Sequence, residues 1–294
     1  MYSLFKDILV EMRIRQYTKN IFVFAALLFS GQMLDIRLFL HAVVAFAAFS
    51  LVSSSIYILN DIIDRKKDRE HPVKCKRPIA AGKIPLVESI CLSGGVFVTG
   101  IMLGLVITKS LLYILLIYAA INIAYSLYLK HMVIIDVMTI AAGFVLRALA
   151  GVAATGVGTT SWFILCIFML ALFLGLAKRY GELVAQTEGN GNTRRVLNYY
   201  SLELVRTLSI IVTAIMLTSY ALFAQSSDSL SDFPLMLLTL PIVLYGVFRY
   251  WYLVLVQGKG EQPEEILLND RGILFTVIVY ILAIMFARDL GGIW

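Results

Sequence analysis

Long runs of apolar residues dominate the chain, and short polar stretches separate them. A run of roughly 20 apolar residues can cross the hydrocarbon core of a bilayer as one helix. The pattern predicts about nine such helices, at about 20–35, 38–59, 86–107, 110–129, 133–155, 161–181, 205–224, 234–255 and 272–290. Because most connections are short, we expect an all-α, polytopic membrane protein with one integral membrane domain over residues 1–294.

The composition agrees with a membrane protein and excludes an ordinary soluble domain. Hydrophobic residues make up 60% of the chain and charged residues only 15%. The three cysteines, Cys75, Cys91 and Cys166, form no CxxC pair and have no histidine at ligand spacing, so we expect neither a disulfide framework nor a zinc site. The segment before the first apolar run carries Asp7 and Glu11 and has no clear small-x-small cleavage site, so we expect a retained amphipathic lead-in.

Lysine and arginine gather in alternate connections. With about nine spans, the basic connections all fall on one side of the membrane: 1–19, 60–85, 130–132, 178–206 and 249–271. The other side has Arg37, Lys109 and Arg288 and an acidic loop at 225–233. This asymmetry follows the positive-inside rule and predicts a protein of the cytoplasmic (inner) membrane whose N-terminus faces the cytoplasm. Topology and anionic lipids explain the net charge of +6, so we expect no nucleic-acid partner.

The densest charge lies in residues 60–82, NDIIDRKKDREHPVKCKRPIAAG, after the second predicted span. On a helix, Asp61, Asp64 and Asp68 would lie along one face. Such close carboxylates repel one another unless a cation lies between them, and Mg²⁺ prefers oxygen ligands and bridges carboxylates to phosphates. The segment also offers basic residues that suit phosphate oxygens, namely Lys66, Lys67, Arg69, Lys74, Lys76 and Arg77.

Charge alone more often marks a solvated cytoplasmic loop that only sets topology. The register of the three aspartates, the adjacent Asn60 and the RPIAAG ending favour a binding site instead. We expect Pro72 and Pro78 to end the helix and fold the basic half back as a loop.

A second polar set surrounds the turn between two predicted spans. Tyr125 and Lys130 lie near its cytoplasmic end, where an interfacial tyrosine and a basic residue are also expected from topology. Asp136 is harder to explain by topology, because it lies just inside an apolar span where a carboxylate is energetically expensive.

Two further sets contain arginine. Arg147 lies near the middle of a span, where a cation must pair or face a wet cavity, and a structural role and a phosphate ligand both remain open. At the end of the sixth span, Lys178, Arg179 and Glu182 match the basic charge that topology requires, but Lys178 and Arg179 could also turn inward. Lys178 and Glu182 have the i, i+4 spacing of a common surface pair.

The pattern Asn60-Asp61-x-x-Asp64-x-x-x-Asp68 resembles the first aspartate-rich motif of the UbiA superfamily of intramembrane prenyltransferases, and YSLYLK (125–130) resembles that superfamily too. The closer resemblance is to its polyprenyl-phosphate phosphoribosyltransferase branch. It runs through RIRQYTKN (13–20), HPxKxxRPIAAG (71–82), LKHMVIIDVMTIAAGFVLRALAG (129–151), LALFLGLAKRYGEL (170–183) and EEILLNDRGIL (264–274). The resemblance implies about nine transmembrane helices around a central cavity, with Mg²⁺ holding a pyrophosphate.

One departure from the superfamily changes the implied substrate. Ordinary members carry a second aspartate-rich motif at the end of the sixth helix, where this chain has Lys178, Arg179 and the single acid Glu182. Basic residues there suit a further phosphate better than a second metal. The resemblance therefore implies transfer of phosphoribose from phosphoribosyl pyrophosphate to a polyprenyl, decaprenyl-like phosphate, as a step toward cell-envelope glycan.

The resemblance also implies roles for individual residues. The metal ligands would be Asp61, Asp64 and Asp68. The residues in catalysis would be Asp61, Asp64, Lys130, Lys178 and Arg179. The substrate-binding residues would be Lys19, Asn60, Lys74, Lys76, Arg77, Tyr125, Asp136, Arg147 and Glu182.

Two alternatives remain open at this point. A conventional prenyltransferase would move an isoprenoid from its diphosphate to an aromatic acceptor, and a transporter or lipid-binding protein would carry out no chemistry. The sequence also leaves open whether the chain forms a homo-oligomer.

Overall fold

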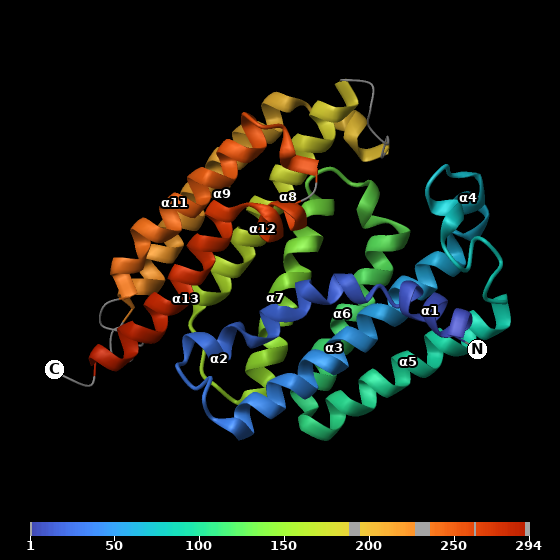
Figure 1. Cartoon of the computed structure of the whole chain (residues 1–294), viewed down its shortest axis with the longest axis horizontal. Helices are drawn as coiled ribbons and strands as arrows, with labels where there is room; N and C mark the ends of the chain where they lie inside the picture. Colours follow the sequence, from blue (N-terminus) through green and yellow to red (C-terminus); the bar gives the residue numbers. More distant parts are fainter. Residues whose placement is uncertain (1, 188–194, 227–235, 262, 292–294) are drawn as a thin grey trace. The chain divides into compact units, whose positions relative to one another are not determined.

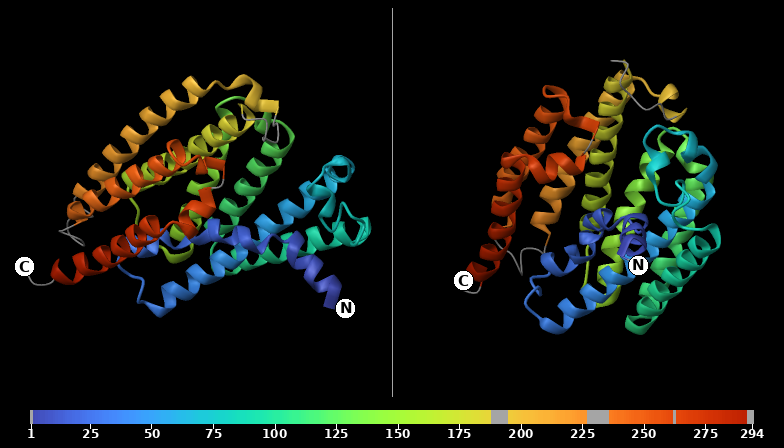
Figure 2. Two further views of the ribbon diagram at one scale, coloured as in Figure 1. Left: turned by 45° about the horizontal axis from the view of Figure 1, so that its top comes forward. Right: turned by 45° about the vertical axis from the view of Figure 1, so that its right-hand side comes forward.

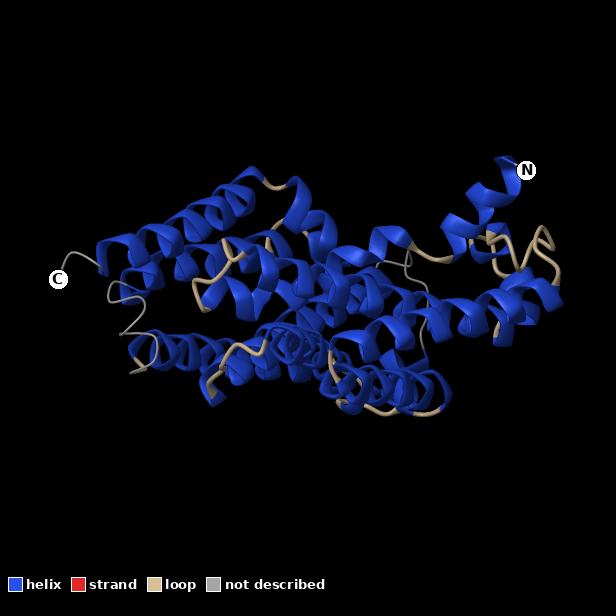
Figure 3. Ribbon diagram, turned by 90° about the horizontal axis from the view of Figure 1, so that it is seen from below, coloured by secondary structure: helices blue, strands red, loops and turns tan. Residues whose placement is uncertain are grey.

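The computed structural model describes residues 2–187, 195–226, 236–261 and 263–291, and over these residues it contains helices and loops without strands (Figure 3). The α-helices are α1 (Tyr2–Glu11), α2 (Ala25–Phe29), α3 (Ile36–Ile63), α4 (Arg65–Glu70), α5 (Leu86–Ile107), α6 (Lys109–Leu127), α7 (Ile135–Thr155), α8 (Ser161–Thr187), α9 (Leu202–Gln225), α11 (Leu240–Leu255), α12 (Pro263–Asn269) and α13 (Arg271–Gly291). The 3₁₀ segments are η1 (Ile14–Phe24), η2 (Lys74–Lys76), η3 (Leu129–His131), η4 (Arg195–Tyr199), η5 (Met236–Thr239) and η6 (Lys259–Glu261). The all-α prediction is confirmed.

Among the described residues, 7 helices are long and apolar enough to cross a membrane, so the chain is a multi-pass membrane protein. They correspond to the predicted spans from 38–59 to 234–255. The first predicted span is not one long helix, because residues 20–35 are divided among η1, α2 and the turn that follows. The last apolar helix is shorter over its described part, Arg271–Ile284. The count of about nine is therefore not confirmed. Most of the acidic 225–233 loop and the side chain of Arg288 lie outside the described residues.

The chain divides into two compact units. The first comprises Met1–Leu28, Gln32–Leu127 and Leu146–Gly158, and the second comprises Phe29–Gly31, Tyr128–Val145 and Thr159–Trp294. Helix α7 contributes its second half to the first unit and its first half to the second. The expectation of a single domain over the whole chain stays a prediction.

In the first unit, α3, α5 and α6 pack against one another (Figure 1). Glycine permits the close approach of α5: a Cβ atom on Gly100 would lie 2.9 Å from the carbonyl oxygen of Ala48. The tightest contact lies between α7 and η1, where a Cβ atom on Gly151 would lie 1.8 Å from the carbonyl oxygen of Val23. Glycine at position 151 therefore lets η1 pack directly on α7.

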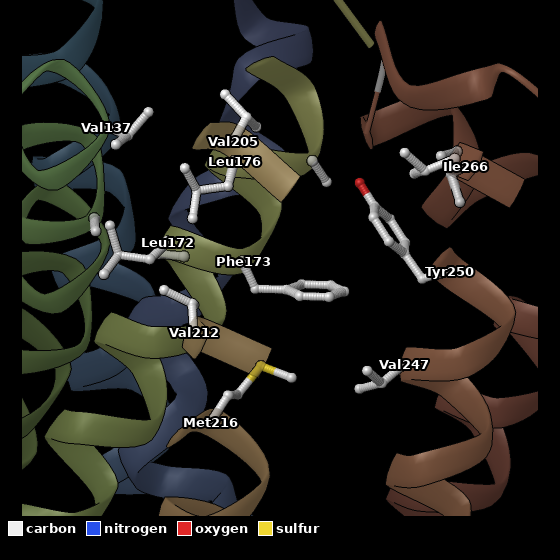
Figure 4. Packing of buried hydrophobic residues seen from close by; sticks show 14 of the residues in the cluster. Val137, Leu172, Phe173, Leu176, Val205, Val212, Met216, Val247, Tyr250 and Ile266 are labelled. Carbon is white, nitrogen blue, oxygen red and sulfur yellow. The ribbon is translucent and has the colours of Figure 1, made fainter. Parts of the chain in front are cut away.

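In the second unit, α8 packs along α9, and the core beside them contains mainly aliphatic side chains together with the rings of Phe173 and Tyr250 (Figure 4). The ring of Phe173 on α8 lies 5.1 Å from that of Tyr250 and 5.3 Å from that of Trp251, both on α11. Val137, at the start of α7, belongs to the same core as Leu176, in the second half of α8. This packing brings together the segments that carry Asp136 and Arg179.

Candidate functional site

The aspartate segment in the first unit is not one continuous helix. Helix α3 ends at Ile63, Asp64 forms the cap with φ −85° and ψ 3°, and the six-residue α4 follows. Asp61 and Asp68 are buried on either side of this junction, and Asp64 is half-buried. The three carboxylates therefore belong to two helices and their junction rather than to one helix face.

The basic half of the segment folds back onto the end of α3, as the prolines predict. Figure 2 shows α4 and the following loop between the end of α3 and the start of α5. Arg69 Nε donates a hydrogen bond to the Ala80 carbonyl oxygen at 3.0 Å. Ile79 is buried in a small cluster with Ile58 and Ile84. The RPIAAG sequence is thus a packed loop rather than a solvated tether.

Two arginines hold the buried aspartates. Arg77 Nη1 lies 2.8 Å from Asp61 Oδ1 and 2.7 Å from Asp68 Oδ2, so one guanidinium joins both carboxylates. Arg13 Nη2 donates to both oxygens of Asp61, at 2.6 and 2.9 Å. Sequence reasoning included Arg77 but missed Arg13, because topology alone explains a basic residue in the lead-in segment. The aspartate and arginine side chains together form what we call the acid–arginine cluster: Arg13, Asp61, Asp68 and Arg77.

Several contacts fix the backbone around Arg13. Its φ of 52° and ψ of 49° are left-handed, an uncommon conformation for a residue other than glycine. Ser54 Oγ donates to the Met12 carbonyl oxygen at 2.8 Å. The Ile79 N–H donates to Glu11 Oε1 at 2.7 Å. Burial raises the pKa of the Glu11 carboxyl to about 7; the bond from Ile79 opposes this shift, and the charge of Asp61 adds to it.

The carboxylates of Asp61, Asp64 and Asp68 fit Mg²⁺ in their chemistry, because they supply hard oxygen donors. In the described part of the chain, however, no group of three or more His, Cys, Asp or Glu side chains is arranged to hold a metal ion. Guanidinium groups contact the oxygens of Asp61 and Asp68 instead. A metal ion there would compete with Arg13 and Arg77 for these oxygens.

Arg147 lies in a separate polar cluster of the first unit and is 6% exposed. Its Nε donates to Asn20 Oδ1 at 2.8 Å, and its Nη2 donates to Tyr118 Oη at 3.0 Å. The guanidinium carbon also lies 5.2 Å from the centre of the Phe49 ring and 5.0 Å from that of Tyr118. Of the two roles that the sequence leaves open, these contacts favour a structural one, joining η1, α6 and α7.

The other predicted residues of the first unit lie near the surface. Asn60 precedes Asp61 on the last turn of α3, and its carbonyl oxygen accepts the Asp64 N–H at 2.9 Å. Lys74 is half-buried and Lys76 is exposed, both in η2. Lys19 on η1 and Tyr125 on α6 are half-buried. Their substrate-binding roles stay predictions.

The second unit contains a buried ion network. Asp136, which is 0% exposed, lies 2.9 Å from Arg179 through Oδ2 and accepts a 2.6 Å hydrogen bond from Tyr200 Oη on Oδ1. Arg179 is 2% exposed and also pairs with Glu182. Burial is the main cause that raises the pKa of Tyr200, and its bond to Asp136 adds to it. The structure thus brings three predicted residues together and adds Tyr200, which sequence reasoning missed.

The same network supports the turn that carries Lys130. The Ile134 N–H donates to Tyr200 Oη at 2.7 Å, and Ile134 has a φ of 70°, which is rare for a β-branched residue. Lys130 lies on η3, a few residues before Ile134. Among the described residues, Arg13 and Ile134 are the non-glycine positions with positive φ, and each adjoins one charged cluster. Unusual backbone conformations of this kind concentrate at functional sites.

The helices thus define a multi-pass membrane protein in which each unit holds paired acidic and basic side chains: the acid–arginine cluster in the first unit, and Asp136, Arg179 and Glu182 in the second. The chain belongs to the UbiA prenyltransferase family, whose family model matches residues 20–267.

Two similar relatives carry the same name. The decaprenyl-phosphate phosphoribosyltransferase of Mycolicibacterium smegmatis is 32% identical to the chain over 294 residues, covering 95% of this chain and 91% of that protein. The decaprenyl-phosphate phosphoribosyltransferase of Mycobacterium tuberculosis is 31% identical over 296 residues, covering 98% and 96%. Among solved structures, a UbiA homolog from Archaeoglobus fulgidus bound to DMAPP and Mg²⁺ has a TM-score of 0.71, with 16% identity and coverage of 97% of this chain and 99% of that chain. At this identity the structural likeness concerns the fold alone.

Proposed function

We propose that the chain is a Mg²⁺-dependent polyprenyl-phosphate phosphoribosyltransferase of the cytoplasmic membrane, with its active site facing the cytoplasm. It transfers 5-phosphoribose from phosphoribosyl pyrophosphate to a polyprenyl, decaprenyl-like phosphate and releases pyrophosphate. The observation that carries the proposal is the identity of 31–32% to relatives with this activity in their name, over more than nine-tenths of this chain. The basic residues at 178 and 179 agree with a donor that carries an additional phosphate.

The acid–arginine cluster is the proposed site for the pyrophosphate of the donor. Asp61 and Asp64, with Asp68, would hold Mg²⁺, which when bound neutralises charge on the leaving pyrophosphate. Arg77 and the nearby Lys74 are placed in the folded-back loop, where their charges can stabilise the outer pyrophosphate oxygens. Asp61 and Asp68 are buried, and their ion pairs with Arg13 and Arg77 hold both carboxylates in place.

The reaction needs no strong general base. The acceptor is a phosphate monoester, which is already anionic near neutral pH, so its oxygen can attack C1 of the ribose directly. The new bond joins that oxygen to C1, and the bond from C1 to the pyrophosphate oxygen breaks, with the electron pair leaving on pyrophosphate. The chain's part is to bind the two anions, orient them and limit access of water to C1.

The cations of the second unit are our candidates for the remaining phosphates. Lys130 lies on a turn that the Tyr200–Ile134 hydrogen bond supports, and Lys178 precedes Arg179 on α8. Arg179 is held between Asp136 and Glu182, so its guanidinium has a fixed orientation. We assign Lys130, Lys178 and Arg179 to the 5-phosphate of the donor or the phosphate of the acceptor.

The alternative is the reaction that gives the family its name, transfer of an isoprenoid from its diphosphate to an aromatic acceptor. Residues 178–182 argue against this alternative. A prenyl diphosphate would need a second aspartate cluster for a second metal, and this chain has Lys178 and Arg179 there instead. The names of the similar relatives also favour the phosphoribosyl reaction.

The test is a transfer assay with the purified, folded protein. Labelled phosphoribosyl pyrophosphate, Mg²⁺ and decaprenyl phosphate should yield an acid-labile lipid-linked phosphosugar and equimolar pyrophosphate. A parallel reaction contains a prenyl diphosphate and an aromatic acid in place of these substrates. Absence of the phosphosugar together with a prenylated aromatic product would replace the proposed function by the alternative.

A further inference from the structure

Arg13 contacts the carboxylate that the proposed function assigns to the metal. Its Nη2 donates to Asp61 Oδ1 at 2.6 Å and to Asp61 Oδ2 at 2.9 Å. Arg77 Nη1 donates to the same Oδ1 at 2.8 Å. These three bonds take up both lone-pair sites of Oδ1 and one of the two on Oδ2, and a divalent cation would draw on the same sites. A guanidinium group and a metal ion therefore compete for Asp61.

Asp61 and its two arginine partners differ in their exposure to solvent. The Asp61 side chain is 4% exposed, whereas those of Arg13 and Arg77 are 29% and 30% exposed. The two arginine side chains are therefore partly open to solvent, whereas the carboxylate that they bind is not. Of the three side chains, the arginines are the more accessible to an incoming pyrophosphate.

The charges of the acid–arginine cluster balance without a metal. Two arginines face two aspartates in this cluster, so a divalent cation at the carboxylates leaves both guanidinium charges to be compensated. Pyrophosphate offers oxygens that match a guanidinium in charge and in bidentate geometry. The charge balance therefore favours an exchange in which the arginines move from carboxylate to pyrophosphate oxygens.

The main chain at Arg13 is anchored, so a side-chain rotation suffices for this exchange. The two residues directly before Arg13 both accept hydrogen bonds. The Met12 carbonyl oxygen accepts one from Ser54 Oγ, and the Glu11 carboxylate accepts one from the Ile79 N–H. The guanidinium carbon of Arg13 lies 4.9 Å from the centre of the Tyr57 ring, a contact that supports the side chain without using its N–H groups.

We propose that Arg13 is a pyrophosphate-binding residue whose guanidinium holds Asp61 in the substrate-free protein and moves to the pyrophosphate when the donor binds with Mg²⁺. This inference rests on the proposed function and adds to it a residue outside the aspartate segment. The movement of Arg13 couples the binding of metal and pyrophosphate. The metal alone binds weakly because the guanidinium competes with it for Asp61, and pyrophosphate strengthens metal binding by drawing the guanidinium away.

Two binding measurements on the purified full-length protein test the exchange. Mn²⁺ is the spectroscopic probe for the metal, first alone and then with inorganic pyrophosphate. Arg13→Gln should raise the affinity for Mn²⁺ alone by about 3- to 10-fold, because a competing cation is removed, and lower the affinity for pyrophosphate in the presence of Mn²⁺ by about 10- to 100-fold. Arg15→Gln is the matched control, since Arg15 is exposed on the same segment and its loss changes the net charge equally.

Arg13→Lys covers the case in which the glutamine variant fails to fold. Lysine keeps the charge but has no planar fork, so both affinities should shift in the same directions by smaller factors. If Arg13→Gln or Arg13→Lys lowers both affinities together, or leaves both at the Arg15→Gln values, Arg13 only supports the fold and the inference fails while the proposed function stands. If the wild-type protein does not bind pyrophosphate with Mn²⁺, the proposed function fails as well.

Discussion

Removing the charge of Asp136 should destabilise the second unit strongly. Asp136→Asn keeps the size of the side chain but takes the negative charge from Arg179, which is 2% exposed. Breaking a buried ion pair at one partner costs about 3–5 kcal/mol, because the other charge stays buried without compensation. Arg179 keeps its pair with Glu182, and the amide oxygen of asparagine can still accept one hydrogen bond. We therefore expect Asp136→Asn to lower the free energy of unfolding by about 2–3 kcal/mol, which is roughly a 30- to 150-fold increase in the unfolding equilibrium constant.

The assay is unfolding in mixed micelles, followed by tryptophan fluorescence, on Asp136→Asn, Arg179→Gln and the double variant. Because the two side chains share one ion pair, the double variant should lose less free energy of unfolding than the sum of the single losses, by more than about 1 kcal/mol. Arg249→Gln is the control; it breaks an ion pair with Asp270 that is open to solvent, and should change stability far less. Additive single losses, or an Asp136→Asn loss as small as the control's, would refute the buried-pair reasoning.

Three further predictions concern the first unit. Asp64→Asn should leave the protein folded and abolish pyrophosphate release, whereas Glu70→Gln, at an exposed acid of the same segment, should turn over normally; near-normal release from Asp64→Asn would remove this aspartate from the metal site. Gly151→Ala should destabilise by about 1–3 kcal/mol, because its Cβ would overlap the Val23 carbonyl oxygen, while Gly95→Ala, where nothing lies within 4 Å, should be neutral or stabilising; equal melting temperatures would contradict the close contact. The pKa of the Glu11 carboxyl rises from 4.5 to about 7 in the folded protein, so the free energy of unfolding of the metal-free wild type should fall as the pH rises from 4.5 to about 7. Glu11→Gln, measured by thermal unfolding between pH 4.5 and 8, should flatten that dependence.

The long apolar runs were sufficient to predict the fold class and seven of the spans, because the length and composition of a membrane helix can be read from consecutive residues. The first predicted span, 20–35, is not one helix, and the reason lies in long-range contacts. Residues 14–24 include Asn20, whose side chain is buried against Ser50 and Arg147, and this segment forms a 3₁₀ helix packed on α7 at Gly151. Its polar residues make tertiary contacts, which the length of an apolar run does not reveal.

The candidate site was predictable where its residues are close in sequence. Asp61, Asp64, Asp68 and Arg77 lie in one charged segment, and Pro78 marks the loop that returns Arg77 to the aspartates. Arg13 contacts Asp61 across 48 positions. Long-range partners depend on how helices pack, and a single sequence carries no direct signal of that packing.

Tyr200 was missed for the same reason, since it reaches Asp136 across 64 positions. The cost of burying a carboxylate at the start of a span did predict that Asp136 needs a partner. It could not predict that the partners are Arg179, already selected for its basic character, and a tyrosine beyond the end of α8.

The decisive measurement is the product that the purified protein forms from phosphoribosyl pyrophosphate, decaprenyl phosphate and Mg²⁺. We expect one lipid-linked ribose 5-phosphate for each pyrophosphate released, with both signals lost in Asp61→Asn and retained in Glu70→Gln. A folded wild-type protein that forms no such lipid, or an Asp61→Asn variant that forms it at the wild-type rate, would refute the phosphoribosyltransferase function or the metal site at Asp61, respectively.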